Sequence, residues 1–114
     1  MEKYMLIFRN NPAMFQQAAP EAIQQNIQQW MQWMGQLGAS GTLAGADQLH
    51  FGGKVVSTSK KSVTDGPFLE AKELVGGYII IHAESLDKAT EIASDCPALN
   101  FEGSVEVRPI QVQG

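Results

Sequence analysis

The stretch that decides the fold is LVGGYIIIH at residues 74–82, the strongest strand candidate in the chain. Side chains of a strand point alternately to its two faces, and in this run both faces carry large apolar residues. A second apolar run, YMLIF at residues 4–8, lies within the segment from 3 to 9. Such runs are typical of strands that are buried on both faces. We therefore predict strands over residues 3–9 and 74–82.

The clearest helix is predicted over residues 20–37. Pro20 suits the first helical position, and Gly38 suits the C-terminal cap. Glutamines fill the polar side of this helix, and Trp33 lies at the margin of its apolar stripe. The stripe repeats at helical spacing and consists of Ile23, Ile27, Trp30, Met31, Met34 and Leu37.

Burial of this stripe would have a measurable consequence at Ile27. Ile27→Ala is expected to lower the free energy of unfolding by about 2–4 kcal/mol, as at a buried helix position. Gln28→Ala, on the opposite side, is expected to change it by less than about 0.5 kcal/mol. Equal denaturant midpoints for the two variants would mean that the other face of the helix is buried.

Shorter elements complete the pattern. Ser85 is a good N-cap and Asp87 lies in the first turn of a second helix, which is expected to end at Pro97. The Gly-rich residues 39–53 indicate a loop or a short irregular strand. The remaining predicted strands are a hairpin, at 54–57 and 62–64, and a last alternating strand at 104–112.

These elements follow the order β–α–β(hairpin)–β–α–β, which is the ferredoxin-like pattern of the α+β class. We predict a single domain over residues 1–114, with an antiparallel sheet and two helices on one of its faces. Because both long strands are apolar on two faces, the other sheet face also needs a cover. The simplest cover is the sheet of a second copy, which predicts a two-fold homodimer.

Composition and charge narrow the class of protein. Apolar residues make up 44% and charged residues 18% of the 114, which is typical of a folded domain. A formal net charge of −4 and a pI near 5.0 suit polyanions poorly, so we expect no nucleic acid partner. The lone cysteine, the absence of a signal-peptide pattern and the absence of a long apolar run predict a cytoplasmic protein without membrane association.

Residues 63–73, VTDGPFLEAKE, resemble the signature of the D-G-P-F branch of the YCII-related family. The segments GGY at 76–78 and GSVEVRPI at 103–110 are similar to the usual continuation of that signature. The tryptophan-bearing first helix also resembles the family's, so the likeness covers essentially the whole chain. The resemblance implies a ferredoxin-like protomer within a dimeric α/β barrel.

The resemblance also implies an active-site cleft with a histidine and an aspartate, and an enzymatic role that is firmly assigned in very few members. One relative is implicated in dechlorinating an aromatic catabolite, and D-G-P-F members are often linked with extracytoplasmic-function sigma factors. The family's better-described branch carries its histidine near the first helix, whereas residues 20–38 of this chain contain none. Only the aspartate maps onto this sequence, as Asp65.

Asp65 is the strongest catalytic candidate. A turn aspartate usually bonds the backbone N–H two residues further on, but here that residue is Pro67, which has no N–H. The carboxylate is therefore freer to face a pocket, where it would act as a general acid or base. The alternative, an aspartate that only shapes the turn, stays open.

Further residues are candidates for substrate binding. Phe68 would form a pocket wall or a core anchor. Glu73 would bring a second carboxylate near Asp65, and the alternative is a solvated residue of the charged stretch at 70–73. Trp33, at the edge of the helix stripe, is the tryptophan best placed to line a cleft; the alternative, a core residue like the rest of the stripe, is the default.

Arg9 and Arg108 end strands that are neighbours in a ferredoxin-like sheet. Either guanidinium would hold an anionic substrate. The alternative is an ion pair with Glu106 or Glu102.

His50 and His82 are the remaining acid–base candidates, because histidine titrates near neutral pH. His50 lies in the Gly-rich loop and is a weak catalytic candidate, whereas His82 ends a strand. No motif with metal-ligand spacing and no phosphate or dinucleotide fingerprint occurs, so we expect neither metal nor cofactor. Cys96 has no activating neighbour and is interpreted as a buried thiol.

Two functional hypotheses follow. The first is a small-molecule-binding protein that acts as a cofactor-independent enzyme on a small metabolite, with Asp65 as acid or base. The second is a non-catalytic dimeric module that binds a ligand or regulates a sigma-factor system. A cofactor-less monooxygenase on the same barrel rests on fold analogy alone, and neither charge nor motifs fit RNA binding.

Overall fold

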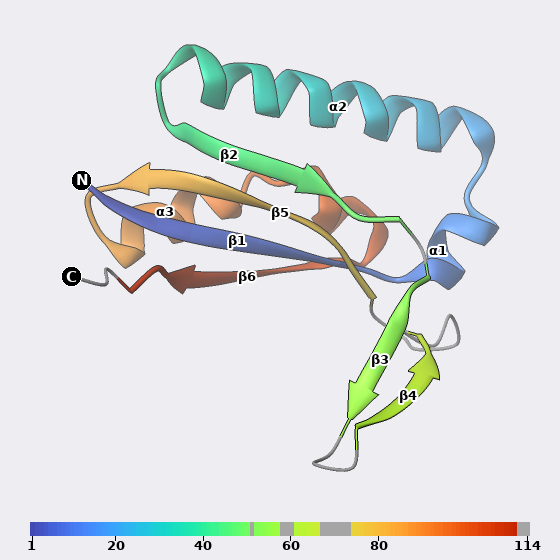
Figure 1. Ribbon diagram of the computed structural model, residues 1–114. Coiled ribbons are helices and arrows are strands. Elements are labelled where there is room, and N and C mark those ends of the chain that lie inside the picture. The colour runs from blue at the N-terminus through green and yellow to red at the C-terminus, as the bar shows by residue number, and fades with distance from the viewer. Residues whose placement is uncertain (51, 58–60, 67–73, 112–114) are drawn as a thin grey trace.

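The computed structural model describes residues 1–50, 52–57, 61–66 and 74–111. Its main sheet has four antiparallel strands in the order β2-β5-β1-β6 (Figure 1). The central pair is β1 (Glu2–Asn10) and β5 (Leu74–Ala83), with β2 (Leu43–Gln48) and β6 (Ser104–Pro109) at the edges. The strands predicted over residues 3–9 and 74–82 are therefore confirmed, and they lie side by side.

Both predicted helices are present. The first, α2 (Pro20–Ala39), has Pro20 in its first turn and runs through Gly38, so that Ser40 takes the capping position expected of the glycine. The second, α3 (Leu86–Ala93), begins after Ser85, whose Oγ accepts a hydrogen bond from the backbone N–H of Lys88 at 3.2 Å. Two short helices, α1 (Pro12–Gln17) and the 3-10 helix η1 (Pro97–Phe101), complete the described chain.

The hydrophobic core lies on one face of the main sheet. Alternate side chains of the two central strands meet there, while each helix contributes from a single face. Because these side chains form one cluster, both helices cover the same side of the sheet. The α+β, ferredoxin-like prediction is confirmed in this respect. The cluster consists of Tyr4, Leu6, Phe8, Trp33, Leu37, Ile79, Ile81, Ala83, Ala89, Ala93, Cys96 and Ala98.

The prediction that the hairpin takes the place of the second strand is wrong. That place belongs to β2, LAGADQ, which pairs antiparallel with β5. Glycine, alanine and aspartate are depleted in strands, so the local sequence masked this element, and the open edge of β5 supplies the pairing instead. The hairpin, β3 (Lys54–Ser57) and β4 (Ser62–Asp65), is a separate two-stranded sheet that projects away from the main one (Figure 1).

The sheet face opposite the helices carries a second, smaller apolar area. Met5 and Ile7 of β1 lie beside Ile80 and Tyr78 of β5, and all four are half-buried. Charged residues of β1 and β6 border them. We call this surface the open sheet face, and its residues are Met5, Ile7, Arg9, Tyr78, Ile80, His82, Glu106 and Arg108.

The buried side of α2 differs from the predicted stripe. Trp33 and Leu37 are buried in the core, whereas Ile27 is 51% exposed and Met31 is 70% exposed. The expectation that Ile27 is a core residue is therefore wrong, as is the expectation that Trp33 is marginal. Burial of the large Trp33 indole in the core is favourable and accompanies this rotation, while Trp30 is only partly buried.

This rotation changes the expected effect of truncating each residue. Leu37→Ala, at a position only 8% exposed, is expected to lower the free energy of unfolding by about 2–4 kcal/mol. Ile27→Ala is expected to lower it by less than about 1 kcal/mol, because half of that residue already contacts water. Urea unfolding followed by circular dichroism measures both. A larger loss for Ile27→Ala would mean that a further surface covers it.

Candidate functional site

A cleft of about 530 Å³ lies between α2 and the sheet. The wall on the helix side is apolar and is formed by Ile27, Trp30, Met31 and Met34. The opposite side is formed by the neighbouring ends of β1, β2 and β5. Ile27 and Met31 belong to the apolar stripe predicted from the sequence but do not reach the core. They line this cleft instead, which explains why they are exposed.

Hydrogen bonds from α2 to η1 fix the position of the helix above this cleft. The Nδ2 atom of Asn26 donates to the backbone oxygen of Pro97 at 3.1 Å. One helical turn on, the Oε1 atom of Gln29 accepts from the Nδ2 of Asn100 at 2.8 Å. These bonds fasten the η1 side of α2, and the cleft lies on the side that faces β2 and β5.

Two consecutive glycines allow neighbouring groups to pack closely against β5 at the sheet side of the cleft. A Cβ atom on Gly77 would lie 2.7 Å from the backbone oxygen of Asp47, so no larger residue fits without a shift of β2. A Cβ atom on Gly76 would overlap the side-chain amide of Asn10, which also lines the cleft. The Gly-Gly-Tyr segment thus has a local structural role at the base of the cleft.

Aromatic contacts hold Trp30 in the cleft wall. Its ring lies edge-to-face against Phe8, with centroids 4.9 Å apart and an interplanar angle of 86°. A second edge-to-face contact joins it to Trp33 at 5.6 Å and 79°. Such pairs are favourable beyond the burial of their area, so the position of the wall is set by the core behind it.

One ionisable pair joins β2 to β5 on the open sheet face, at the strand ends that form the cleft. The hydroxyl of Tyr78 donates to the Oδ2 atom of Asp47 at 2.6 Å. This bond to a carboxylate, together with the negative charge of Asp47, raises the pKa of the Tyr78 phenol. Tyr78 is therefore neutral at physiological pH, and the carboxylate of Asp47 has a partner of its own.

Asp65 lies outside this cleft. It is the last residue of β4, is exposed, and forms an ion pair with Lys54 directly across the hairpin. The next residue, Gly66, donates its backbone N–H to the backbone oxygen of Gly53 at 3.1 Å and so closes the hairpin. In the described structure Asp65 is a hairpin residue, and it is not among those that line the cleft.

The other predicted site residues are scattered. Phe68 and Glu73 lie outside the described residues. His50 is exposed beyond the end of β2, and Trp33 belongs to the core rather than to the cleft wall. His82 lies on the open sheet face, and its backbone N–H donates to the oxygen of Thr42 at 2.8 Å.

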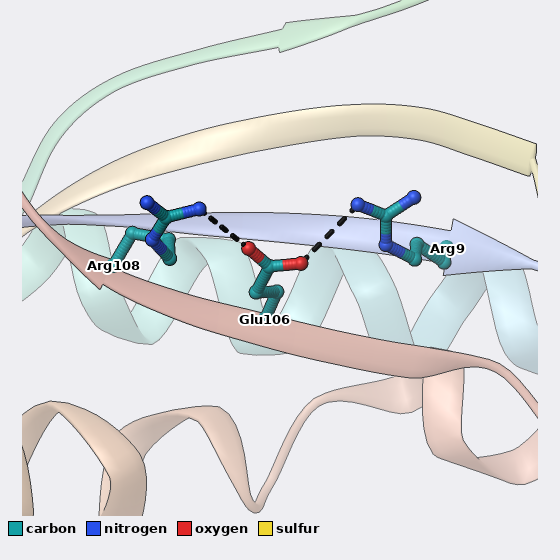
Figure 2. Close-up of polar contacts among 3 residues, drawn as sticks. All are labelled: Arg9, Glu106 and Arg108. Atoms are coloured by element: carbon teal, nitrogen blue, oxygen red, sulfur yellow. Dashed lines mark hydrogen bonds and ion pairs between the residues drawn. The ribbon is translucent and has the colours of Figure 1, made fainter.

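Arg9 and Arg108 both pair with Glu106 on the open sheet face (Figure 2). The Nη2 of Arg9 lies 3.2 Å from Oε1, and the Nη1 of Arg108 lies 2.9 Å from Oε2. Hydrogen bonds from Arg108 and then Arg9 hold the pKa of the Glu106 carboxyl below its usual range. Any stability from the cluster is therefore present at neutral pH and is lost as the pH falls through that lowered pKa. In the described structure both arginines therefore form the ion pairs with Glu106 that were the alternative to substrate binding.

Cys96 is a buried thiol, as predicted. Its Sγ accepts a hydrogen bond from the backbone N–H of Ala98 at 3.4 Å, at the start of η1. Burial raises the pKa of the Cys96 thiol to about 12, so almost no thiolate is present at neutral pH. Its burial and its raised pKa both disfavour a nucleophilic role for Cys96.

Sequence reasoning missed the residues that define the cleft. Asn26 is an amide within the buried side of an otherwise apolar helix face, and that contrast was the available signal. The described part of the chain contains no cluster of three potential metal ligands. None of its helices is both long enough and apolar enough to cross a membrane.

The fold and the cleft together define a ferredoxin-like α+β domain with an apolar-walled concavity beside its long helix. The chain belongs to the YCII-related domain family, whose model matches residues 2–112. The family predicted from the sequence is thereby confirmed.

The chain is similar to a known protein in sequence and to a solved structure in fold. Uncharacterized protein R00369 of Rhizobium meliloti (strain 1021) is 40% identical over 70 residues, which are 60% of this chain and 52% of that protein. The chain thus spans about half the length of this relative. Among solved structures, 5-chloro-2-hydroxyhydroquinone dehydrochlorinase from Burkholderia phenoliruptrix AC1100, in complex with 2,5-dihydroxybenzoquinone, matches with a TM-score of 0.43 and 17% identity. That match covers 95% of this chain and 93% of the other.

Proposed function

We propose that this chain is a small-molecule-binding protein whose ligand occupies the cleft between α2 and the sheet. The observation that carries the proposal is the cleft itself, with about 530 Å³ of space, an apolar wall and a few polar groups. Clefts of a few hundred Å³ with this mixture are the usual form of small-molecule sites. Exposed Ile27 and Met31 also leave an apolar surface on α2 that a ligand would cover.

Catalysis by Asp65 is a separate question from ligand binding in the cleft. A general acid or base has to come within hydrogen-bond reach of the ligand, about 2.6–3.2 Å. Asp65 is exposed, pairs with Lys54 and lies apart from the residues that line the cleft of its own protomer. This observation favours the second hypothesis, binding without catalysis, over a cofactor-independent enzyme that uses Asp65. Membership of the D-G-P-F branch and a link to a sigma-factor system stay predictions.

The proposal includes a homodimer that forms through the open sheet face and resembles a dimeric α/β barrel. Support comes from Met5, Ile7 and Ile80, which form an apolar centre that no described helix covers. A second sheet on this face would bury that centre and leave both clefts, on the opposite side, accessible. The single domain over residues 1–114 and the cytoplasmic location are likewise proposals drawn from the sequence.

Toluene is a suitable probe of the cleft, because it is small, uncharged and without polar groups. In ¹H–¹⁵N NMR spectra we expect toluene to shift the indole N–H of Trp30 and the backbone amide of Gly77. Met31→Glu is expected to weaken this binding by at least about tenfold, since it places a charge on the apolar wall. Met31 is largely exposed, so this variant is expected to remain folded.

Gln28→Glu is the matched control, because it adds the same charge to the same helix on a side away from the cleft. Its toluene affinity is expected to stay within about twofold of the starting protein, as for a distant surface charge. Shifts that map elsewhere, or equal effects of the two substitutions, would contradict the proposed site.

A further inference from the structure

The cleft contains one buried amide whose orientation is fixed by chemistry. Asn26 is 95% buried, since only 5% of it is exposed, yet it lines the cleft. Its partner outside the cleft is the backbone oxygen of Pro97, 3.1 Å away. A carbonyl oxygen only accepts hydrogen bonds, so the nitrogen of the amide has to face Pro97 and the Oδ1 atom has to face the other way.

The Oδ1 atom of Asn26 has no hydrogen-bond partner among the described residues. Side-chain nitrogen and oxygen atoms that are fully shielded from solvent all have partners in the described structure. Oδ1 is therefore not shielded, and the cleft is the space that Asn26 lines. A polar atom held this way is a ready acceptor for a donor on a ligand, since leaving it unpaired under an apolar ligand is costly.

The charge of the cleft argues against charged ligands. Among the described residues that line it, Asp47 is the one charged residue, and its carboxylate bonds Tyr78 on the open sheet face, so no charged side chain of these residues faces the cleft. A ligand with a charge of either sign would leave water without an opposite charge in the cleft to pair with. The ligand is therefore uncharged.

The walls of the cleft favour a planar ring. The rings of Phe8 and Trp30 line it together with two methionines, Met31 and Met34. Aromatic rings pack well against other rings, and thioether sulfurs make favourable contacts with ring edges.

We infer that the cleft selects uncharged aromatic molecules that carry an N–H or O–H donor, and that the Oδ1 atom of Asn26 accepts the hydrogen bond from that donor. This inference rests on the proposed function, because it specifies the ligand class of the same cleft. Asn26 is a specificity residue in this account: the apolar wall supplies most of the contact area, and the amide distinguishes ligands with a donor from those without one.

Indole and benzofuran test the inference as a matched pair of probes. The two molecules have nearly the same shape, but only indole carries a ring N–H. Affinities measured by ¹H–¹⁵N NMR titration are expected to favour indole by about tenfold, the usual scale for one good hydrogen bond. Indole-3-carboxylate, which adds a negative charge, is expected to bind at least about tenfold more weakly than indole.

Asn26→Leu tests the role of the amide. The preference for indole over benzofuran is expected to fall to within about twofold, while benzofuran still binds. Because this variant also loses the bond to Pro97, its fold is checked by the same spectra, and the comparison of ligands on the unsubstituted protein stands without it.

The outcomes separate the inference from the proposed function. Equal affinity of indole and benzofuran in the cleft would overturn the inference and leave the binding site intact. Indole-3-carboxylate binding as tightly as indole would overturn the part that concerns charge. Failure of all three probes and of toluene to shift any cleft residue at millimolar concentration would overturn both.

Discussion

Gly103→Ala is expected to lower the free energy of unfolding by about 3 kcal/mol, a large effect for one added methyl group. A Cβ atom at this position would lie 2.6 Å from the backbone oxygen of Ala98 and 2.8 Å from that of Arg9. Both atoms belong to the main chain, which cannot rotate away as a side chain would. Gly103 also donates its N–H to the oxygen of Ala98 at 3.1 Å, so η1, β1 and the start of β6 meet at this residue.

Gly35→Ala is the matched control. Gly35 lies inside α2, and a Cβ atom there would meet nothing within 4 Å. The same substitution is therefore expected to raise the free energy of unfolding by about 0.5–1 kcal/mol through helix propensity. Urea midpoints that move in the same direction for both variants would contradict the close approach at Gly103.

Much of this fold is readable from the sequence because hydrophobic pattern and local capping agree there. The central strands are continuous apolar runs, and α3 starts where Ser85 supplies a cap. The sequence left β2 open as a loop or a short irregular strand within residues 39–53, because LAGADQ has little strand propensity, and pairing with β5 imposes its conformation. The rotation of α2 about its axis was not predicted either. A stripe of apolar residues identifies one face of a helix, but it does not show which part of that face contacts the core.

The candidate site is harder to read because it depends on residues that are ordinary one at a time. Asp65 stands out in the sequence through its turn chemistry, yet the described structure pairs it with Lys54 on an exposed hairpin. Asn26 has no motif around it, and its interest comes from Pro97, which is 71 residues away along the chain. Only the three-dimensional contact shows which amide atom is used and which is left for a ligand.

The arginine cluster lies at the border of the open sheet face, through which we propose that the homodimer forms. Arg9 and Arg108 share Glu106, so the border of this face carries two positive charges and one negative charge. Their side chains are partly exposed in the protomer, where such ion pairs contribute little. Between two copies the same groups would lose water, and their pairing would then affect which register of the two sheets is allowed.

Ile7→Arg is expected to convert the proposed homodimer into a monomer, with the dissociation constant raised at least about 100-fold by the burial of one charge from each copy. Ile7 lies on β1 in the open sheet face, directly beside Glu106 of β6. That carboxylate offers the new guanidinium an acceptor in the isolated protomer, so the fold is expected to survive. Gln24→Arg, on the exposed side of α2, is the control and is expected to leave association unchanged. Sedimentation equilibrium at micromolar concentration measures all three proteins: a monomeric starting protein would refute the dimer, and a dimeric Ile7→Arg variant would place its interface elsewhere.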